Sequence, residues 1–276
     1  MEVRFESSQR ETKRMDTEEL RQNFLIENLM VDDEIKLVYS HYDRVIIGGV
    51  KPVSKTLSLE THPELRADFF LERREIGIIN IGGNGIVEAD GEAHNLSRLD
   101  CVYAGKGVKS VTFRSEDAGN PAVFYLLSAP AHMAYPIRKL PKEEATPTTI
   151  GDPSTSNRRT IYKYIHAEGI ESCQLVMGLT VLDKGSVWNT MPSHTHTRRM
   201  EAYFYFDIPN GQVVFHFMGE PQQTRHMVLQ NYSAIISPPW SIHSGCGTAN
   251  YGFIWGMSGE NYNYTDMDPV AIHDIR

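Results

Sequence analysis

The sequence has few cysteines, no long apolar run and no excess of basic charge. Its three cysteines, Cys101, Cys173 and Cys246, lie far apart and form no C-x-x-C pair. This pattern excludes a disulfide framework and a zinc knuckle, and it favours a reducing compartment. No run approaches the length that spans a bilayer, and residues 1–14 contain no apolar core of signal-peptide length. We therefore expect a cytoplasmic protein without a membrane segment.

Acidic residues outnumber basic ones in this chain. Its 276 residues include 35 Asp and Glu against 27 Lys and Arg, which gives a formal net charge of −8. A surface of this sign repels phosphate backbones, and no basic stripe overrides it, so we expect no nucleic-acid partner. Hydrophobic residues make up 41% of the chain, which is enough to fill the cores of one large or two ordinary domains.

Most of the remaining signal indicates strands. The best helix signal is Asp16 with Glu19 three residues later, which is the spacing of a capping box, and it predicts one short N-terminal helix. After this segment, short runs of Val, Ile, Tyr and Phe alternate with Gly, Asn, Asp and Pro, a pattern typical of antiparallel strands. The Asp90-Gly91 pair marks a hairpin. We therefore predict an all-β fold.

The two halves of the chain resemble each other. Residues 71–77 are similar to residues 197–203, and each segment is followed by two strands around a Gly-containing turn. A period of roughly 125 residues is far longer than that of a solenoid repeat, so it predicts two whole domains. Prolines in the polar stretch 139–157 indicate the linker. We place the domains at residues 1–145 and 146–276.

Four residues of the second half predict a metal site. His194 and His196 are two residues apart, so both rings point to the same face of a strand. Glu201 follows at an odd offset, which requires a bend, and His243 comes from a neighbouring strand of a closed barrel after a Pro-rich corner. Three imidazoles and one carboxylate suit zinc, iron, manganese, cobalt or nickel. They leave one or two positions for water or substrate.

These motifs carry a family resemblance. The pattern His194-x-His196-x4-Glu201, followed by Pro238 to His243, resembles the two metal-binding motifs of the cupin superfamily. More narrowly, the chain resembles the 5-keto-4-deoxyuronate isomerase family over nearly its whole length. The segments that carry this likeness are NTMPSHTH at 189–196, RRME at 198–201, WSIHSG at 240–245, FLERRE at 70–75 and TSNRRT at 155–160.

The resemblance implies both a fold and an activity. The implied fold is a bicupin, two jelly-roll β-barrel domains with the metal inside a barrel. The implied activity is a ketol-isomerase of pectin breakdown in the bacterial cytoplasm, which interconverts 5-dehydro-4-deoxy-D-glucuronate and 3-deoxy-D-glycero-2,5-hexodiulosonate. The family further implies one zinc ion per subunit and a homohexamer. The metal would stabilise the negative charge of an enediolate as a proton moves between C1 and C2.

The first half departs from the metal-binding pattern. Residues 67–70 read Ala-Asp-Phe-Phe where a His-x-His should precede Glu75, and Gly105-Lys106-Gly107 stands near the place of the later histidine. Glu75 alone cannot hold a metal ion. We expect this half to be a degenerate copy without a metal site.

Residues for substrate and proton transfer follow less directly from the sequence. A substrate carboxylate calls for an arginine fork in the pocket. The candidates are Arg158, Arg159 and Arg199. A general base must also take the C2 proton. The candidates, chosen by chemical type and proximity in sequence, are Lys163, Tyr162 and Tyr203. The three tryptophans are expected to pack in the barrels.

Two other classes of function remain open on the same residues. An iron cupin dioxygenase uses these ligands with O2 in the open position, and its turnover consumes oxygen and requires iron. A non-catalytic sugar-binding bicupin would keep the metal as a structural element. Structural zinc sites are usually closed by four ligands that often include Cys, so the open positions argue mildly against this second alternative.

Overall fold

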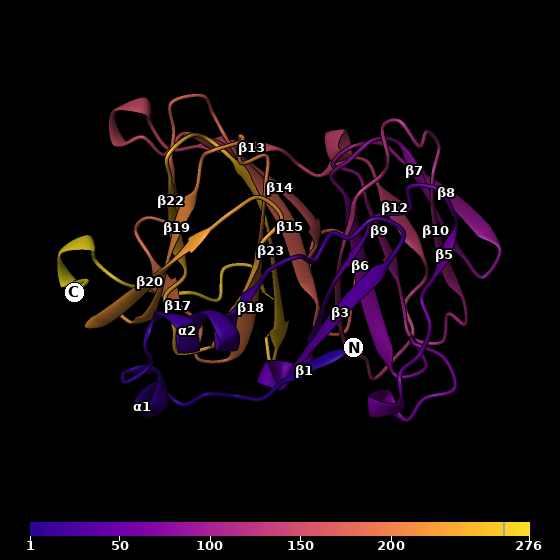
Figure 1. Cartoon of the computed structure of the whole chain (residues 1–276), viewed down its shortest axis with the longest axis horizontal. Coiled ribbons are helices and arrows are strands. Elements are labelled where there is room, and N and C mark those ends of the chain that lie inside the picture. The colour runs from indigo at the N-terminus through magenta and orange to yellow at the C-terminus, as the bar shows by residue number, and fades with distance from the viewer. Residues whose placement is uncertain (262) are drawn as a thin grey trace.

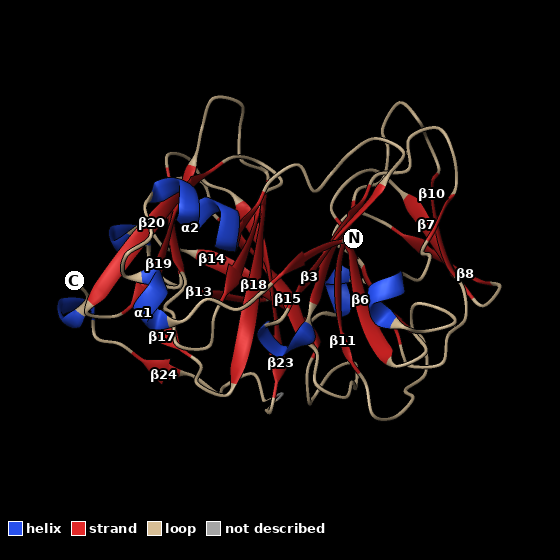
Figure 2. Ribbon diagram, turned by 60° about the horizontal axis from the view of Figure 1, so that its bottom comes forward, coloured by secondary structure: helices blue, strands red, loops and turns tan. Residues whose placement is uncertain are grey.

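The computed structural model describes residues 1–261 and 263–276, and strands dominate it, with helices at the periphery (Figure 2). Each half of the chain contains a seven-stranded and a four-stranded sheet, and the two halves lie side by side (Figure 1). The mostly-β prediction is therefore confirmed. Within the described residues, no helix combines the length and the apolar character needed to cross a membrane.

The first half consists of a large and a small sheet. In spatial order, the strands of the large sheet are β1 (Glu2–Arg4), β3 (Ile35–Ser40), β4 (Ile46–Val50), β11 (Phe124–Pro130), β6 (Arg74–Asn80), β9 (Cys101–Ala104) and β12 (Arg138–Leu140). Those of the small sheet, again in spatial order, are β5 (Leu57–Ser58), β10 (Val111–Ser115), β7 (Gly85–Ala89) and β8 (Glu92–Leu96).

The second half repeats this arrangement and adds one short pair of strands. Its large sheet contains β13 (Thr148–Ile150), β14 (Arg159–Ile165), β15 (Val176–Leu182), β23 (Gly252–Gly259), β18 (Arg199–Phe206), β21 (Ala234–Ser237) and β2 (Leu25–Ile26). Its small sheet contains β16 (Trp188–Asn189), β22 (Ser244–Gly247), β19 (Val214–Glu220) and β20 (Gln223–Leu229). The additional pair is β17 (His194–Thr195) with β24 (Asp268–Pro269).

The helices are short. They are α1 (Gln9–Thr12), α2 (Thr17–Phe24) and the 3-10 turns η1 (Tyr42–Arg44), η2 (Pro63–Leu65), η3 (Lys142–Glu144), η4 (Pro153–Thr155) and η5 (Ile272–Asp274). The predicted helix is α2, and the reciprocal capping bonds between Asp16 and Glu19 are present. The sequence analysis missed α1, although Ser8 and Glu11 form a second capping box with the same spacing.

The N-terminal segment packs on the second half of the molecule. Strand β2 pairs with β21, where Leu25 lies opposite Ile235, and α1 and α2 lie against the second half in Figure 1. The buried side chains Leu20 and Phe24 belong to the same hydrophobic core as the second-half strands. Residues 1–26 therefore contribute β1 to the large sheet of the first half and β2 to the large sheet of the second half.

The turns divide each half into two layers. Strands β7 and β8 form the predicted hairpin around Asp90-Gly91. The chain passes from β6 in the large sheet to β7 in the small one, and likewise from β18 to β19. No hydrogen-bonded ladder among the described strands joins the large and the small sheet of either half. The expected closed barrels are therefore not formed, because the crossing turns direct consecutive strands into separate layers.

The two large sheets pack face to face between the halves. Tyr125 of β11 stacks on Phe204 of β18 with ring centroids 4.8 Å apart, and both side chains are fully buried. The approach is so close that a Cβ atom on Gly77 would lie 2.6 Å from both Ile165 Cδ1 and Met177 Sδ. A glycine there lets the sheets approach without displacing these two side-chain ends. One continuous hydrophobic core thus spans the two halves.

Strands β6 and β18 occupy equivalent places and show how the halves differ. Arg74 and Arg199 each begin their strand and lie opposite the last residue of the neighbouring strand. Counting from these arginines, Ile76 corresponds to Glu201. Because side chains alternate between the two faces, Glu75 faces the other half. Its carboxylate accepts hydrogen bonds from Tyr103 Oη and from the backbone N–H groups of residues 173–175, at 2.7–3.0 Å.

Candidate metal centre

Four side chains from three neighbouring segments meet at one point. His194 lies on β17, His196 follows it, and the chain then bends so that Glu201 points inward from β18. The backbone N–H of Arg199 donates to the His196 carbonyl in this bend, which the sequence analysis predicted. His243 comes just before β22, after a corner closed by the hydrogen bond from the Ser241 N–H to the Pro238 carbonyl.

The potential ligand atoms are close to one another. His194 Nε2 lies 3.1 Å from His196 Nε2 and 2.9 Å from His243 Nε2. Glu201 Oε2 lies 2.9 Å from the Nε2 atoms of both His196 and His243. All four atoms fall within 4.8 Å of one another, and the group is largely buried.

These separations fit one metal ion. Bonds of about 2.1 Å place adjacent ligand atoms about 3.0 Å apart in an octahedron and about 3.4 Å apart in a tetrahedron. The four measured separations of 2.9–3.1 Å match the octahedral value. Four ligands in such an arrangement leave two positions open. The buried group of His194, His196, Glu201 and His243 can therefore hold a metal ion.

The electrostatics suit a cation. Burial, and next the neighbouring His243, lowers the pKa of His194 to about 2, so its ring stays neutral as a metal ligand must. Burial alone would raise the pKa of Glu201. The charge of His243 and the hydrogen bonds from His196 and His243 outweigh it, so this pKa lies well below its usual value. The site therefore offers a neutral imidazole at His194 and an ionised carboxylate at Glu201.

Two of the histidines are oriented by their second ring nitrogen. His196 Nδ1 donates to the backbone carbonyl of Asp266 at 2.6 Å, which leaves Nε2 free to face the other ligands. His243 Nδ1 lies 3.4 Å from the Ser237 hydroxyl. Such partners hold the ring of a metal ligand in one orientation and one tautomer.

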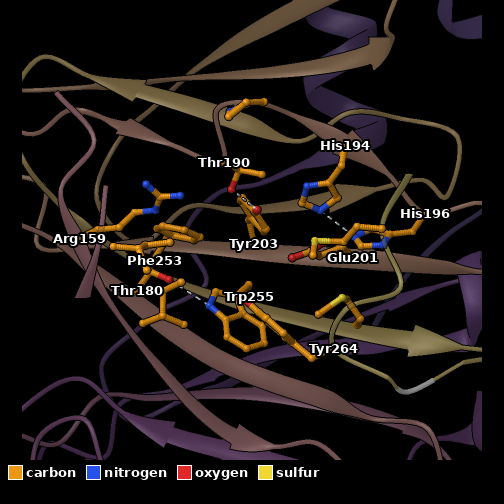
Figure 3. A pocket seen from close by; sticks show the side chains of 15 residues that line it. Arg159, Thr180, Thr190, His194, His196, Glu201, Tyr203, Phe253, Trp255 and Tyr264 are labelled. Carbon is orange, nitrogen blue, oxygen red and sulfur yellow. Dashed lines mark hydrogen bonds and ion pairs between the residues drawn. The ribbon is translucent and has the colours of Figure 1, made fainter. Parts of the chain in front are cut away.

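The ligand cluster opens into a cavity of about 230 Å³. This volume far exceeds the roughly 10–15 Å³ that a single water needs, so the cavity can hold a small molecule. Its lining residues are Ile150, Arg159, Ile161, Thr180, Thr190, Pro192, His194, His196, Glu201, Tyr203, Phe253, Trp255, Met257, Tyr264 and Met267. In Figure 3, Arg159 and His196 lie on opposite sides of this group, with Tyr203 between them.

The structure separates the candidate arginines. Arg159 lines the cavity. Arg158 is half exposed and forms an ion pair with Asp183 at 3.2 Å. Arg199 is buried and donates to backbone carbonyls of residues 261–266, and it does not line the cavity. Only one of the three is thus placed to meet a molecule bound beside the metal ligands.

The three candidate proton-transfer residues also differ. The Tyr203 hydroxyl lies 2.8 Å from that of Thr190, and both residues line the cavity. Burial, and then the charge of Glu201, raises the pKa of Tyr203 well above its usual value, so the phenol keeps its proton. Tyr162 and Lys163 do not line the cavity, and the Lys163 ammonium lies over the Tyr264 ring, 5.2 Å from its centroid.

Several cavity residues were not predicted from the sequence. Tyr264 and Met267 come from the C-terminal segment, in which no periodic pattern indicated a role. Trp255 was expected only to pack, but it lines the cavity while its indole N–H donates to Thr180 at 3.1 Å. Thr190 lay inside a recognised motif but carried no signal of its own. Its neighbour Tyr203 was the available clue. Every second residue of β18 points to the same face, so Tyr203 shares the face of Glu201.

Proteins of one family resemble this chain over nearly its whole length. A model of the KduI/IolB family matches residues 25–273. The chain belongs to this family. Among curated KduI/IolB relatives, the 4-deoxy-L-threo-5-hexosulose-uronate ketol-isomerase of Halalkalibacterium halodurans is 55% identical over 276 residues, with full coverage of both chains. The protein of the same name from Escherichia coli is 52% identical over 278 residues, again with full coverage of both.

Solved structures share the fold of this KduI/IolB chain at much lower identity. An IolB-like protein from Salmonella typhimurium has a TM-score of 0.74 and 14% identity, covering 90% of this chain and 97% of its own. Oxalate decarboxylase from Bacillus subtilis, whose Mn(II) centres are named with its structure, has a TM-score of 0.55 and 11% identity, covering 81% and 71%. These likenesses concern the fold.

Proposed function

We propose that this protein is a metal-dependent ketol-isomerase that interconverts 5-dehydro-4-deoxy-D-glucuronate and 3-deoxy-D-glycero-2,5-hexodiulosonate. The observation that carries the proposal is the cluster of His194, His196, Glu201 and His243 open to a cavity, in a chain at least 52% identical to proteins named for this reaction. The reaction belongs to the breakdown of pectin and other uronates.

The proposed metal is zinc, one ion per subunit, held by the four clustered residues. A divalent cation there would act as a Lewis acid on the carbonyl and the adjacent hydroxyl of the sugar. The protein's own contribution is to hold three imidazoles and one ionised carboxylate close together inside a buried pocket. Burial also limits competition from water for the open positions.

Arg159 is the proposed ligand of the substrate carboxylate. It lines the cavity, and the one hydrogen bond of its side chain among the described residues is to the Asn157 carbonyl, at 2.7 Å. No described carboxylate forms an ion pair with it, in contrast to Arg158. A guanidinium fork at the far side of the cavity from the histidines would direct the C1–C2 end of the sugar toward the metal ligands.

Because its phenol keeps its proton, we propose Tyr203 not as the base for the C2 proton but as the residue that transfers protons to and from the substrate oxygens. Of the three candidates, its side chain alone lines the cavity. Thr190 receives a hydrogen bond from the Asn189 side-chain amide at 3.2 Å, so the threonine proton can point to the Tyr203 oxygen. That arrangement leaves the phenol proton free to face a bound sugar. Tyr162 and Lys163 lack this access.

The assembly and larger architecture are also proposals. The repeated pair of sheets supports a bicupin of two jelly-roll halves, residues 1–145 and 146–276, built as open sandwiches rather than closed barrels. The buried contact between the large sheets supports treating the halves as one rigid body. We further propose a cytoplasmic homohexamer, by resemblance to the isomerase family.

Metal removal and replacement tests the function directly. The purified protein is stripped with a chelator, single divalent metals are restored, and conversion of 5-dehydro-4-deoxy-D-glucuronate is followed. Turnover should disappear with the metal and return with zinc. The variant His243→Ala should lose both bound metal and turnover. Full turnover in metal-free protein would contradict the proposed mechanism.

The same assay separates the two alternative functions. Consumption of O2 with a strict requirement for iron would favour a dioxygenase. Binding of the sugar without any conversion, under every metal, would favour a non-catalytic sugar-binding protein. Conversion without oxygen uptake is the outcome we expect.

A further inference from the structure

We propose that residues 263–270, the C-terminal strap, complete the metal centre from outside, and that Arg199 is the positioning residue that holds this strap. The inference rests on the metal site of the proposed function. It assigns Arg199 a role different from the substrate contact expected from the sequence. It also gives the strap a role that neither the ligand motifs nor the family likeness assigns.

The strap contacts the ligand-bearing segment along its length. Strand β24 pairs with β17, so that Pro269 lies opposite His194 and Asp268 opposite Thr195. The N–H of Val270 donates to the Ser193 carbonyl at 2.9 Å. The strap therefore fixes the backbone that carries the first histidine.

The strap also fixes the second histidine through its ring. His196 Nδ1 donates to the Asp266 carbonyl at 2.6 Å. The ring is 2% exposed, so in this structure water does not compete with the Asp266 carbonyl for Nδ1. Loss of the acceptor would free the ring to rotate and to change its tautomer, and Nε2 would then leave the ligand cluster.

Arg199 holds the strap by its backbone. Its side chain is fully buried, and its guanidinium donates to carbonyl oxygens at 2.7–3.4 Å. The accepting residues are Asn261, Asn263, Tyr264 and Asp266. The Asp266 carbonyl therefore accepts from both Arg199 and His196. A fork with several fixed donors suits this task better than a lysine ammonium, which is a compact point charge.

A second, more exposed contact reinforces the first. Arg198 Nε donates to both carboxylate oxygens of Asp266, at 2.7 and 2.9 Å, and its Nη2 reaches Asp268 at 2.9 Å. Exposed pairs of this kind contribute modestly because water competes with them. The consecutive arginines thus hold the strap by its side chains at the surface and by its carbonyls in the interior.

The inner side of the strap forms part of the cavity. Tyr264 and Met267 both line it, and the Tyr264 ring packs against the Trp255 ring with centroids 5.2 Å apart. One short segment thus supplies the acceptor of a ligand histidine and one wall of the substrate cavity. A displaced strap is expected to weaken the binding of metal and of substrate together.

The test compares Arg199→Lys with a matched control, Arg74→Lys. Arg74 is the equivalent buried arginine of the first half, where it donates to the Arg44 and Ser128 carbonyls and makes no hydrogen bond to the described residues of the strap. The dissociation constant of zinc is measured for the full chain by competition with a chromophoric chelator. For Arg199→Lys we expect it to rise about tenfold or more, the usual effect of removing a partner of a metal ligand. It should stay unchanged in Arg74→Lys.

Asp266→Ala is a second variant, which tests the strap even if Arg199→Lys does not fold. It removes the surface contact with Arg198 but leaves the Asp266 carbonyl, so we expect zinc affinity to weaken about two- to fivefold, roughly the range of an exposed ion pair. The proposal would be overturned if Asp266→Ala binds zinc with unchanged affinity and Arg199→Lys either binds zinc with unchanged affinity or does not fold. Equal weakening by Arg74→Lys would also overturn it. If the unmodified protein binds no metal at all, the proposed function itself fails.

Discussion

The two halves of this molecule contain equivalent strands whose side chains face different surroundings. Strands β6 and β18 both begin with a buried arginine, Arg74 or Arg199, that donates to backbone carbonyls. Two residues later the first half has Ile76, which packs in an apolar core, where the second half has Glu201, which faces three histidines. The comparison teaches that the strand is retained where an apolar side chain takes the place of the carboxylate, because packing alone requires the strand.

The carboxylates of the two strands show the same divergence. Glu75 and Glu201 are both buried, but they point to opposite faces of their sheets. Glu75 follows Arg74 by one residue and Glu201 follows Arg199 by two, and side chains alternate between the faces of a strand. Glu201 faces the cavity. Glu75 faces the other half and receives three backbone N–H groups from residues 173–175. A carboxylate of similar local sequence thus serves as a contact between the halves.

The largest expected effect comes from removing the ligand carboxylate. Glu201→Ala should release the metal and reduce kcat/KM about a thousandfold, because Lewis-acid stabilisation is worth several kcal/mol. The equivalent change in the first half, Ile76→Ala, should lower the free energy of unfolding by about 2 to 5 kcal/mol through a cavity. It should leave the metal content unchanged. Metal analysis and isomerase assays of both variants test this difference between the halves. Loss of metal from Ile76→Ala would contradict it.

Glu75→Gln tests the contact between the halves. The amide cannot accept from all three N–H groups, and buried donors left unpaired are costly, so we expect the free energy of unfolding to fall by about 3 kcal/mol. Urea denaturation gives this value. Metal content should stay at the level of the unmodified protein. Wild-type stability in this variant would show that Glu75 does not hold the halves together.

Arg159→Met tests the carboxylate contact beside the metal. Hydrogen bonds to a charged partner contribute about 1.5 to 3 kcal/mol, so kcat/KM for the uronate should fall roughly 10- to 100-fold, with most of the change in KM. Arg158→Met is the matched control, because Arg158 already pairs with Asp183 outside the cavity. Steady-state kinetics of both variants decide the matter. Equal losses of kcat/KM in the two variants would contradict a specific role for Arg159.

Gly77→Ala is expected to have the smallest effect. The new methyl group would press on the ends of Ile165 and Met177, which are flexible and can shift, so the loss of stability should lie near 1 kcal/mol, about the low end for overpacking. The double variant with Ile165→Val should recover part of this loss. Thermal unfolding curves measure both. Full additivity of the two changes would argue against contact between the sheets at this point.

Much of the second half could be predicted from local chemistry. The types and spacing of His194, His196, Glu201 and His243 indicated a cluster that the structure brings together. The capping box at Asp16 predicted α2 for the same reason, since all of its partners lie within one turn. Such signals need no knowledge of distant pairings.

Other features depended on contacts between distant segments. Arg158 and Arg159 are indistinguishable by type, and only the alternation of β14 directs one into the cavity and the other to Asp183. Tyr162 and Lys163 were chosen by proximity in sequence, which does not report the face of a strand. The prediction of closed barrels was wrong, because the turns that cross between the sheets place consecutive strands in separate sheets.

The amino-acid sequence by itself determined which side chains are able to bind a metal and that strands dominate the chain, because residue chemistry and short-range spacing carry that information. The tertiary structure alone decided that Glu75 joins the halves, that Arg159 faces the cavity and that Arg199 holds the strap. The physical reason is register. A shift of one residue turns a side chain to the opposite face of a sheet, and the register is set by pairings with strands far away along the chain.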